Sequence, residues 1–423
     1  MNYLLKSFLI AISAILLSTS SLFAQGQIYD VVSIGQGYAN QSFYSMANGE
    51  VSTVTNTDWD LAFQIAGFQA SILINGKNNV KLYRSGKDVN AWSNITPNDT
   101  VGVLNPSNEL NNQDTSWWSG AFNITADLSN QFDLGWGVYD FATHAVTGDS
   151  IHFIKLSNGS VKKIWIQQLA NGIYYFAHAN VDGSNEVNAT LSKSAFSGKN
   201  FGYYSILNNT TIDREPLKST WDLTFMQYVT TVPFTYKVTG VLSNDSVSVA
   251  KAYPVDVMNV NYWGQNYSKY INTMGYNWKT FDLNSNQWLI EDSLVYFVNA
   301  RPGVLWKMVF TGFGGASTGD FEFYKEEVSA TGVAENGGQP ALLSVYPNPA
   351  KDMVKMTVYI NKAESGNSAT IFDINGRVVK QMSLEDLEGL NEVTLNTTEL
   401  SSGVYSVQVI ADGAINTSRL IIN

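Results

Sequence analysis

The chain has 423 residues, enough for two or three domains that each bury a hydrophobic core. Its formal charge of −11 comes from only 14% charged residues, and no basic cluster is present to replace the counterions of DNA or RNA, which argues against nucleic-acid partners. The absence of Cys excludes disulfides, thiolate catalysis and Cys-ligated metals, and the 13% of aromatic residues, many at alternating positions, favour an extracellular all-β protein.

Residues 1–24 have the pattern of a cleaved secretion signal. Lys6 precedes an apolar run from Phe8 to Leu17, and a small-residue region ends at Ala24. The apolar run is shorter than the roughly 20 residues that a membrane-spanning helix needs. The sequence therefore predicts a mature form that begins at about Gln25 and has no transmembrane segment.

A short phrase that occurs twice indicates a duplicated domain. "TDWDLAF" at residues 57–63 and "STWDLTF" at residues 219–225 share Trp-Asp-Leu-x-Phe. Strand alternation places Trp59 and Trp221, with the Leu and Phe that follow each, on a buried face. The spacing between the two phrases is too long for a solenoid repeat but suits a duplicated domain.

The flanking segments repeat the same order of elements. A Tyr-Ser strand and an Asn-containing turn precede each phrase. Further along, "GDSIHFIKLSNGSVKKIWIQQLANGIYYFAHA" and "EDSLVYFVNARPGVLWKMVFTGFGGASTGDFEFYKE" each predict three strands joined by Gly-containing turns, with Trp165 or Trp306 in the second strand. We therefore expect two related β-rich lobes, at residues 25–187 and 188–328.

Each lobe resembles the HmuY-like family of secreted haem-binding proteins from Bacteroidota. Members of that family have a Trp-Asp-(Ile/Leu)-Ala-Phe strand and, later, a meander similar to "YFVNARPGVLWKMVFTG". The resemblance covers the strands of residues 28 to about 180 and of about 188 to 328, and it implies haem as a cofactor. This chain departs from familiar members, which are lipid-anchored single domains, because it has two copies and no Cys.

The residues that could ligate haem differ between the lobes. All three His, at positions 144, 152 and 178, lie in the first lobe, where His144 and His152 are the candidate ligands because they fall before the meander or at its start. In the second lobe Met258 and Met274 occupy the comparable interval, and haem iron accepts Met. A packing or exposed role is the alternative for each of these residues, and neither pair matches the family's ligand positions residue by residue.

No catalytic motif is visible, because G-x-S-x-G, H-E-x-x-H and the P-loop lysine motif are all absent. "DLNSNQ" at residues 282–287 begins like a calcium loop but lacks the required Gly and terminal Glu, which favours a polar turn without a metal. Trp92, Trp117 and Trp118, in Asn-rich loops, either pack locally or stack on a sugar or a porphyrin. We expect a non-catalytic protein that captures haem or another apolar small molecule, or alternatively a structural or adhesive surface protein; a glycan-active enzyme is the third alternative.

Residues 329–339 are small and polar, as in a linker, and a third domain follows at residues 340–423. Two prolines favour an extended edge, an Asn-Gly pair predicts a hairpin, and several short strands indicate an immunoglobulin-like β-sandwich. The residues that carry these signals are Pro347, Asn348, Pro349, Asn375, Gly376, Gly403 and Tyr405.

This tail resembles the type A C-terminal sorting domain of proteins exported by the type IX secretion system. The likeness lies in "YPNP", "DINGRVV", "LSSGVY" and a short apolar finish. It implies recognition by the type IX machinery, removal of the tail by its sortase, and attachment to surface polysaccharide or release. The expected location is therefore extracellular or on the outer cell surface, reached through the periplasm and the outer membrane; a retained adhesion module is the alternative.

Overall fold

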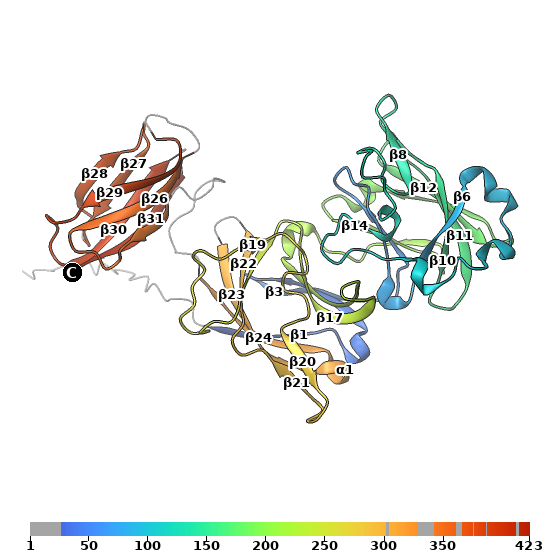
Figure 1. Cartoon of the computed structure of the whole chain (residues 1–423), viewed down its shortest axis with the longest axis horizontal. Coiled ribbons are helices and arrows are strands. Elements are labelled where there is room, and N and C mark those ends of the chain that lie inside the picture. The colour runs from blue at the N-terminus through green and yellow to red at the C-terminus, as the bar shows by residue number, and fades with distance from the viewer. Residues whose placement is uncertain are drawn as a thin grey trace, which may run out of the picture.

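The computed structural model describes residues 27–301, 304–328, 342–360, 366–374, 376–385, 387–411 and 414–423. The predicted signal peptide at 1–24 and the linker at 329–339 lie outside these residues. Strands form nearly all of the regular structure that is described, which confirms the all-β prediction (Figure 1). No helix among the described residues is long and apolar enough to cross a membrane.

Two sheets form each of two lobes, which we call lobe A and lobe B. Lobe A contains β4–β15, and its long sheet holds, in order, β13 (Val187–Ser192), β12 (Ile173–Asn180), β11 (Val161–Ala170), β10 (Ser150–Lys155), β6 (Lys81–Asp88) and β7 (Glu109–Leu110). In the same sheet β9 (Ala145–Gly148) pairs with β11 and with β8 (Gly137–Asp140). The short sheet holds β15 (Thr210–Ile212), β14 (Phe201–Ser205), β4 (Leu61–Gln64) and β5 (Ile72–Ile74).

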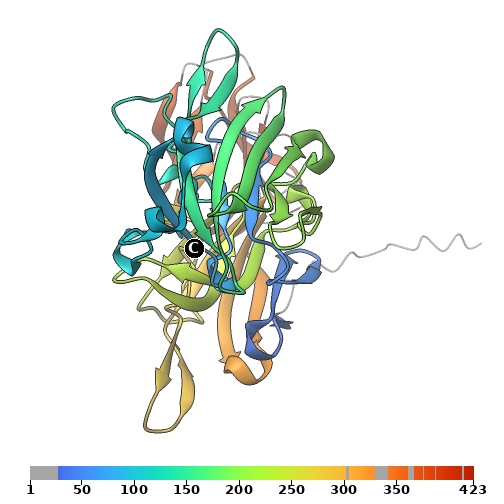
Figure 2. The same ribbon diagram turned by 90° about the vertical axis from the view of Figure 1, so that its right-hand side faces the viewer.

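Lobe B contains β1–β3 and β16–β24. Its long sheet holds, in order, β1 (Ile28–Ser33), β24 (Asp320–Glu327), β23 (Val304–Phe313), β22 (Val295–Arg301), β18 (Ser248–Ala252) and β19 (Tyr267–Ser268). Its short sheet holds β17 (Tyr236–Ser243), β16 (Leu223–Thr230), β2 (Asn40–Ser45) and β3 (Gly49–Thr55). The separate hairpin of β20 (Lys279–Asp282) and β21 (Gln287–Ile290) projects beyond the lobe in both views (Figures 1 and 2).

The two lobes have the same strand order, β13-β12-β11-β10-β6-β7 in one long sheet and β1-β24-β23-β22-β18-β19 in the other. Each long sheet begins with the first strand of one repeat, followed by the three meander strands of the other repeat. Short helices join the strands: α1 (Gly315–Thr318) and the 3-10 helices η1 (Gln36–Tyr38), η2 (Gly76–Asn78), η3 (Val89–Asn94), η4 (Pro97–Thr100), η5 (Pro106–Asn108), η6 (Ala121–Asn123), η7 (Lys193–Phe196) and η8 (Lys218–Thr220).

The repeats exchange their first three strands, β1–β3 and β13–β15. The predicted division between residues 187 and 188 separates the repeats but not the lobes, because each lobe takes three strands from the other repeat. β1 pairs with β24, near the end of the second repeat, and β2 pairs with β16, whereas β13 and β14 of the second repeat pair with β12 and β4 of the first. Figure 1 shows the blue strands of the chain start lying beside yellow and orange strands of the second repeat. Neither lobe is therefore one contiguous segment. Alternation in the sequence predicts a strand and its buried face, but not which copy of a repeated partner it joins.

Each lobe buries its own core. The core of lobe A runs from Leu61 to Ile206, whereas that of lobe B combines Val32 and Tyr44 with residues from Leu223 onwards. Trp59 and Trp221 are 6% and 3% exposed and stand two residues before the equivalent strands β4 and β16, as expected from the repeated phrase.

The tail forms two further sheets that share one core, as in a β-sandwich. One sheet holds β25 (Leu342–Tyr346), β26 (Met353–Ile360) and β29 (Gly389–Asn396), and the other holds β28 (Val378–Ser383), β27 (Ser368–Phe372), β30 (Gly403–Ala411) and β31 (Ala414–Ile422).

Candidate functional site

The repeated Asp holds the exchanged strands in place. Asp60 donates its backbone N–H to the carbonyl of Tyr204 at 3.0 Å, and its carboxylate accepts from the N–H of Ile206 at 2.7 Å. Asp222 donates to the carbonyl of Tyr44 at 2.7 Å and accepts from the N–H of Met46 at 2.7 Å. Each Asp thus binds the first hairpin of the other repeat. The sequence shows that this Asp recurs beside the Trp in both repeats. Strand alternation alone does not predict which residues the Asp binds.

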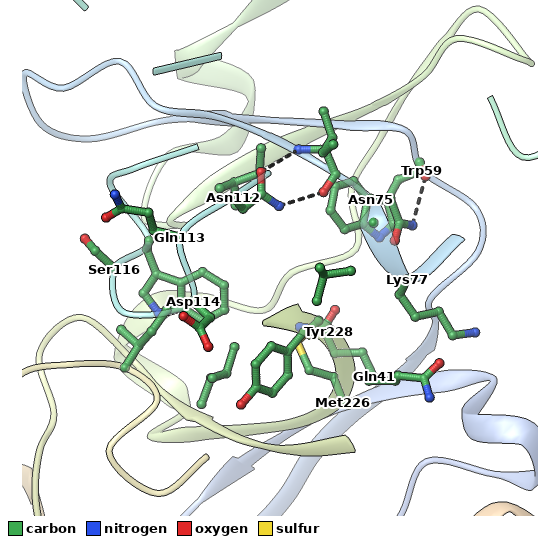
Figure 3. A pocket seen from close by; sticks show the side chains of 18 of the residues that line it. Gln41, Trp59, Asn75, Lys77, Asn112, Gln113, Asp114, Ser116, Met226 and Tyr228 are labelled. Carbon is green, nitrogen blue, oxygen red and sulfur yellow. Dashed lines mark hydrogen bonds between the residues drawn. The ribbon is translucent and has the colours of Figure 1, made fainter. Parts of the chain in front are cut away.

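A cleft lies where lobes A and B meet (Figure 3). Together with the solvent at its mouth it encloses about 650 Å³. Lobe A contributes the end of β5 and the turn at Asn75–Lys77, and lobe B contributes Met226 to Val229 of β16 with Leu242 and Ile271. Clefts between packed units are the usual place for a small-molecule site.

One loop of lobe A, residues 111–120, forms a wall of the cleft and binds lobe B. The indole N–H of Trp117 donates to the carbonyl of Ser243 at 2.8 Å, and the N–H of Ile271 donates to the carbonyl of Thr115 at 3.1 Å. Within lobe A, the Ser71 hydroxyl donates to the carbonyl of Trp117 at 3.1 Å. The loop is therefore held from both sides.

A second cavity of about 680 Å³, including solvent at its mouth, adjoins the first. Asp114 and Tyr228 line both cavities. Thr230, Lys251 and Tyr276 are among the other residues that line the second cavity, and the Tyr236 hydroxyl donates to that of Tyr276 at 2.7 Å. The carboxylate of Asp114 and the phenol of Tyr228 therefore lie at the boundary between the two cavities.

Asp114 and Tyr228 are buried polar groups without a partner among the described residues. The Tyr228 side chain is 6% exposed, and its hydroxyl makes no hydrogen bond there. Burial, followed by the charge of Asp114, raises the pKa of Tyr228, so its phenol is protonated at neutral pH. Asp114 is 9% exposed, and within the described ranges its carboxylate enters no hydrogen bond or ion pair. Buried polar groups are normally hydrogen-bonded, so these two are exceptions that call for an explanation.

Other polar residues of the cleft are already engaged in holding the fold. The Asn75 amide donates to the carbonyls of Asn56 and Trp59, both at 3.0 Å. The Asn112 amide accepts from the N–H of Ile74 at 3.0 Å and donates to the same residue's carbonyl at 2.8 Å. These two amides position the walls, and they differ in this from Asp114 and Tyr228, which are buried in the lining without a hydrogen bond among the described residues.

Arg214 and Glu215 hold two residues that line the cleft, Gln41 and Tyr203. Arg214 donates to the side chain of Gln41 at 2.8 Å and to the carbonyl of Thr55 at 2.7 Å, and its guanidinium lies 5.0 Å from the ring centre of Tyr203. Glu215 accepts from the N–H of Asn200 and Phe201 and from the Tyr203 hydroxyl, and burial raises its pKa to about 7. Since Gln41 belongs to lobe B and Tyr203 to lobe A, this pair joins the lobes.

The predicted haem ligands are not brought together. His144 lies exposed in the β8–β9 turn, where its Nδ1 is 2.9 Å from the Tyr139 hydroxyl. His152 and His178 both pair with Ile164 of β11 and point into the core of lobe A, and burial lowers their pKa values to about 3 and about 4. Neither lines the two cavities.

The Met candidates are also separated. Met258 is 73% exposed, whereas Met274 is buried and lines the second cavity. Among the described residues, no two of the predicted donors face each other across a cavity, and haem with two axial ligands needs that arrangement. These residues therefore do not fit haem. No group of three or more His, Asp or Glu among the described residues could hold a metal ion.

The three loop Trp residues have different environments. Trp92 packs under the Lys163 ammonium, 4.6 Å from the ring centre, and donates to Glu186 at 3.2 Å. Trp118 stacks on Phe201, so of the three only Trp117 lines the cleft. The "DLNSNQ" segment is the polar turn expected from the sequence, because the Asp282 carboxylate accepts from the N–H groups of Asn284 and Ser285.

The sorting-motif residues lie at the ends of tail strands. The Asn348 side chain accepts from the N–H of Ile421 at 2.9 Å and donates to the carbonyl of Arg419 at 2.7 Å, which binds the exposed Pro347-Asn348-Pro349 segment to the last strand. The remaining motif residues are Gly376, with φ of 79° in the turn before β28; Gly403, which begins β30; Tyr405, whose hydroxyl donates to the carbonyl of Ser401 at 2.7 Å; and Asn375, which lies outside the described residues.

Comparison with known proteins identifies the tail. Residues 344–423 match the family model described as "Secretion system C-terminal sorting domain". No curated protein matches the chain. Dimeric latent PorU from Porphyromonas gingivalis matches with 12% identity and a TM-score of 0.18, over 66% of this chain and 31% of that one. None of these findings supports the HmuY-like resemblance of the lobes. The chain therefore carries a type IX secretion C-terminal sorting domain at residues 344–423, which directs it to the exterior or the outer surface of the cell.

Proposed function

We propose that this chain is a non-catalytic binding protein, secreted or held at the cell surface, that captures a small molecule in the cleft between lobes A and B. One observation carries the proposal: the cleft brings Asp114 and Tyr228, both without partners among the described residues, between aromatic and aliphatic walls. A small number of free polar groups among apolar ones is typical of ligand pockets.

Filling the cleft tests this proposal. Met226→Trp adds a ring where β16 faces the cleft, whereas Leu283→Trp places the same ring on the exposed β20–β21 turn, where Leu283 is 86% exposed. We would titrate the mature protein with oligosaccharides, choline and haemin, following intrinsic Trp fluorescence and calorimetric heat. A ligand that binds the wild type and Leu283→Trp but not Met226→Trp supports the cleft. Equal binding by all three forms contradicts it.

For the route to the surface, we propose that the sortase of the type IX machinery removes the tail, and that the mature protein is attached to surface polysaccharide or released. The match of residues 344–423 to a sorting domain supports this route. Mass spectrometry of the exported protein should find no peptide from "RLIIN", and deletion of residues 340–423 should retain the protein inside the cell. A surface form that keeps this peptide would contradict processing.

The exposed aromatic loop of lobe B favours an adhesive function as the second candidate. Between Tyr253 and Tyr270, Met258 and Trp263 are more than half exposed, and Trp263 stacks on Tyr262 with ring centres 4.8 Å apart. Exposed apolar clusters mark interaction surfaces. If adhesion is the function, Trp263→Ser with Tyr270→Ser should reduce attachment of cells that display the protein, and Met226→Trp should leave it unchanged.

A further inference from the structure

We infer that the ligand of the cleft is a neutral saccharide, one hydroxyl of which donates to Asp114 and accepts from Tyr228; this inference rests on the proposed function. The two groups line both adjoining cavities and lack partners among the described residues. Figure 3 shows both side chains directed into the space between the lobes.

The hydrogen-bonding capacity of the pair selects the ligand class. An ionised Asp114 only accepts hydrogen bonds, while the protonated phenol of Tyr228 has a proton to donate. A hydroxyl group donates and accepts at once, so one sugar hydroxyl satisfies both residues. An ammonium ion only donates and would leave the phenol proton of Tyr228 unpaired.

Charge disfavours the other ligand classes. A carboxylate or phosphate group beside Asp114 would meet a like charge in a partly desolvated site. An organic cation would be repelled by the Lys77 ammonium, which lines the same cleft. A neutral ligand avoids both costs.

The walls suit the apolar face of a sugar ring. Trp59, Trp117, Tyr203 and Tyr228 all line the first cavity. Aromatic rings offer flat apolar faces with a negative quadrupole, against which the C–H groups of a pyranose can pack. Free hydroxyls of the ring would then point to the solvent at the mouth.

The cleft arises where the second repeat departs from the first. β16 runs from Leu223 to Thr230, whereas its equivalent β4 ends at Gln64. Met226 is the equivalent of Gln64, the last residue of β4, and Tyr228 lies in the part of β16 that extends beyond it. Both residues line the cleft. Tyr228 therefore has no counterpart in a strand of the first repeat.

The test uses the mature chain with Tyr228→Phe and Asp114→Asn, and with Tyr236→Phe as a matched control. Tyr228→Phe removes a hydroxyl that has no partner among the described residues, so the variant should fold. Tyr236→Phe removes the hydroxyl of a residue that lines neither cavity, although its partner Tyr276 lines the second. We would screen an array of neutral oligosaccharides and measure the strongest by calorimetry. We expect Kd to rise at least tenfold in Tyr228→Phe and Asp114→Asn, and to stay within twofold in Tyr236→Phe.

Three results would overturn the inference, and they separate it from the proposed function. If choline or haemin binds and Met226→Trp abolishes this, the ligand class is wrong but the cleft remains a binding site. If a saccharide binds with unchanged Kd in Tyr228→Phe and Asp114→Asn, its site lies elsewhere. If no saccharide, choline or haemin binds, both the inference and the proposed function fail.

Discussion

Two carboxylates explain why the phrase Trp-Asp-Leu is duplicated. Other apolar residues could replace the Trp, Leu and Phe in the core. The Asp is more specific, because Asp60 and Asp222 each accept a hydrogen bond from a backbone N–H in the exchanged hairpin of the other repeat. The Ser205 hydroxyl also lies 3.3 Å from the Asp60 carboxylate. A charged acceptor forms a stronger bond to a buried N–H than a neutral one does.

We predict that Asp60→Ala and Asp222→Ala each destabilise the protein by about 1–3 kcal/mol, because each leaves a buried N–H without its acceptor. Urea unfolding at pH 7, followed by Trp fluorescence, measures the loss. Asp282→Ala is the control, since it only disturbs an exposed turn and should change stability by less than about 0.5 kcal/mol. Equal effects at all three positions would contradict the anchoring role.

The core histidines predict a loss of stability in acid. Burial lowers the pKa of His152 to about 3 and that of His178 to about 4, with smaller effects from Arg84 and Lys162. Since an unfolded His has a pKa of about 6.5, the unfolded chain binds more protons below that pH, and stability falls as the pH falls. For each His, the free energy of unfolding should fall by about 2 kcal/mol between pH 7 and pH 5.

Unfolding midpoints at pH 7 and pH 5 check this expectation, with His152→Leu and His178→Leu as variants that remove the dependence. Glu215 acts in the opposite direction. Burial raises its folded pKa to about 7, above the unfolded value, so its contribution to stability is present at low pH and is lost as the pH rises towards 7. Glu215→Gln should therefore steepen the acid loss. An acid loss that persists in the double His→Leu variant would assign it to other groups.

At the scale of elements, close backbone contacts fix the wall of the second cavity. Val241 of β17 exchanges backbone hydrogen bonds with Gly275, 3.0 Å in each direction. A Cβ atom on Gly240 would stand 2.3 Å from the carbonyl oxygen of Gly275, which no side-chain movement can relieve. Glycine at position 240 is therefore required by the approach of β17 to residues 272–277 rather than by a turn.

We predict that Gly240→Ala destabilises lobe B by about 1–3 kcal/mol through this overpacking. Leu283→Ala is the control in the same lobe, because Leu283 is 86% exposed and its truncation should change stability by less than about 0.5 kcal/mol. Thermal unfolding of both variants would measure the difference. A wild-type transition for Gly240→Ala would mean that β17 and the 272–277 segment separate more easily than their contact suggests.

The sequence predicted elements better than their assembly. Alternation identified the strands that follow Trp59 and Trp221, and the Asn-Gly and Pro signals identified the strands of the tail, because these signals are local. The cleft could not be predicted, since Asp114 stands in an irregular loop and Tyr228 reads as one more buried strand residue. Haem ligation by His144, His152 and the two Met was a prediction from resemblance alone. Core placement of His152 fits the strand alternation equally well.

At the scale of the molecule, strand exchange makes the two lobes depend on each other. Lobe B needs β1–β3 from the chain start, and lobe A needs β13–β15, which follow β12. Neither pair of sheets is complete until both repeats are present. Strand exchange also keeps the two walls of the cleft together, because the chain crosses between the lobes. At one crossing Arg214 donates hydrogen bonds to Thr55 and Gln41 of lobe B.

Exchange also predicts the behaviour of the first repeat alone. Residues 25–186 contain β1–β12 but lack β13–β15, so lobe A has two open sheet edges and β1–β3 have no lobe B to join. Equivalent residues bond to the Asp in both lobes, Tyr44 and Met46 in one and Tyr204 and Ile206 in the other. The hairpin β2–β3 of one copy therefore suits the vacant place beside β4 in a second copy.

We expect this fragment to form a dimer in which each copy gives β1–β3 to the other, as the repeats do within the full chain. Light scattering should give twice the fragment mass, while the mature full chain runs as a monomer at the same concentration. Asp60→Ala should shift the fragment towards monomer, because Asp60 would accept the N–H of Met46 across the dimer, whereas Asp140→Ala, which alters an exposed turn, should not. A folded monomer would show that β1–β3 can fold back onto their own repeat, and that exchange in the full chain is one of two arrangements of similar energy.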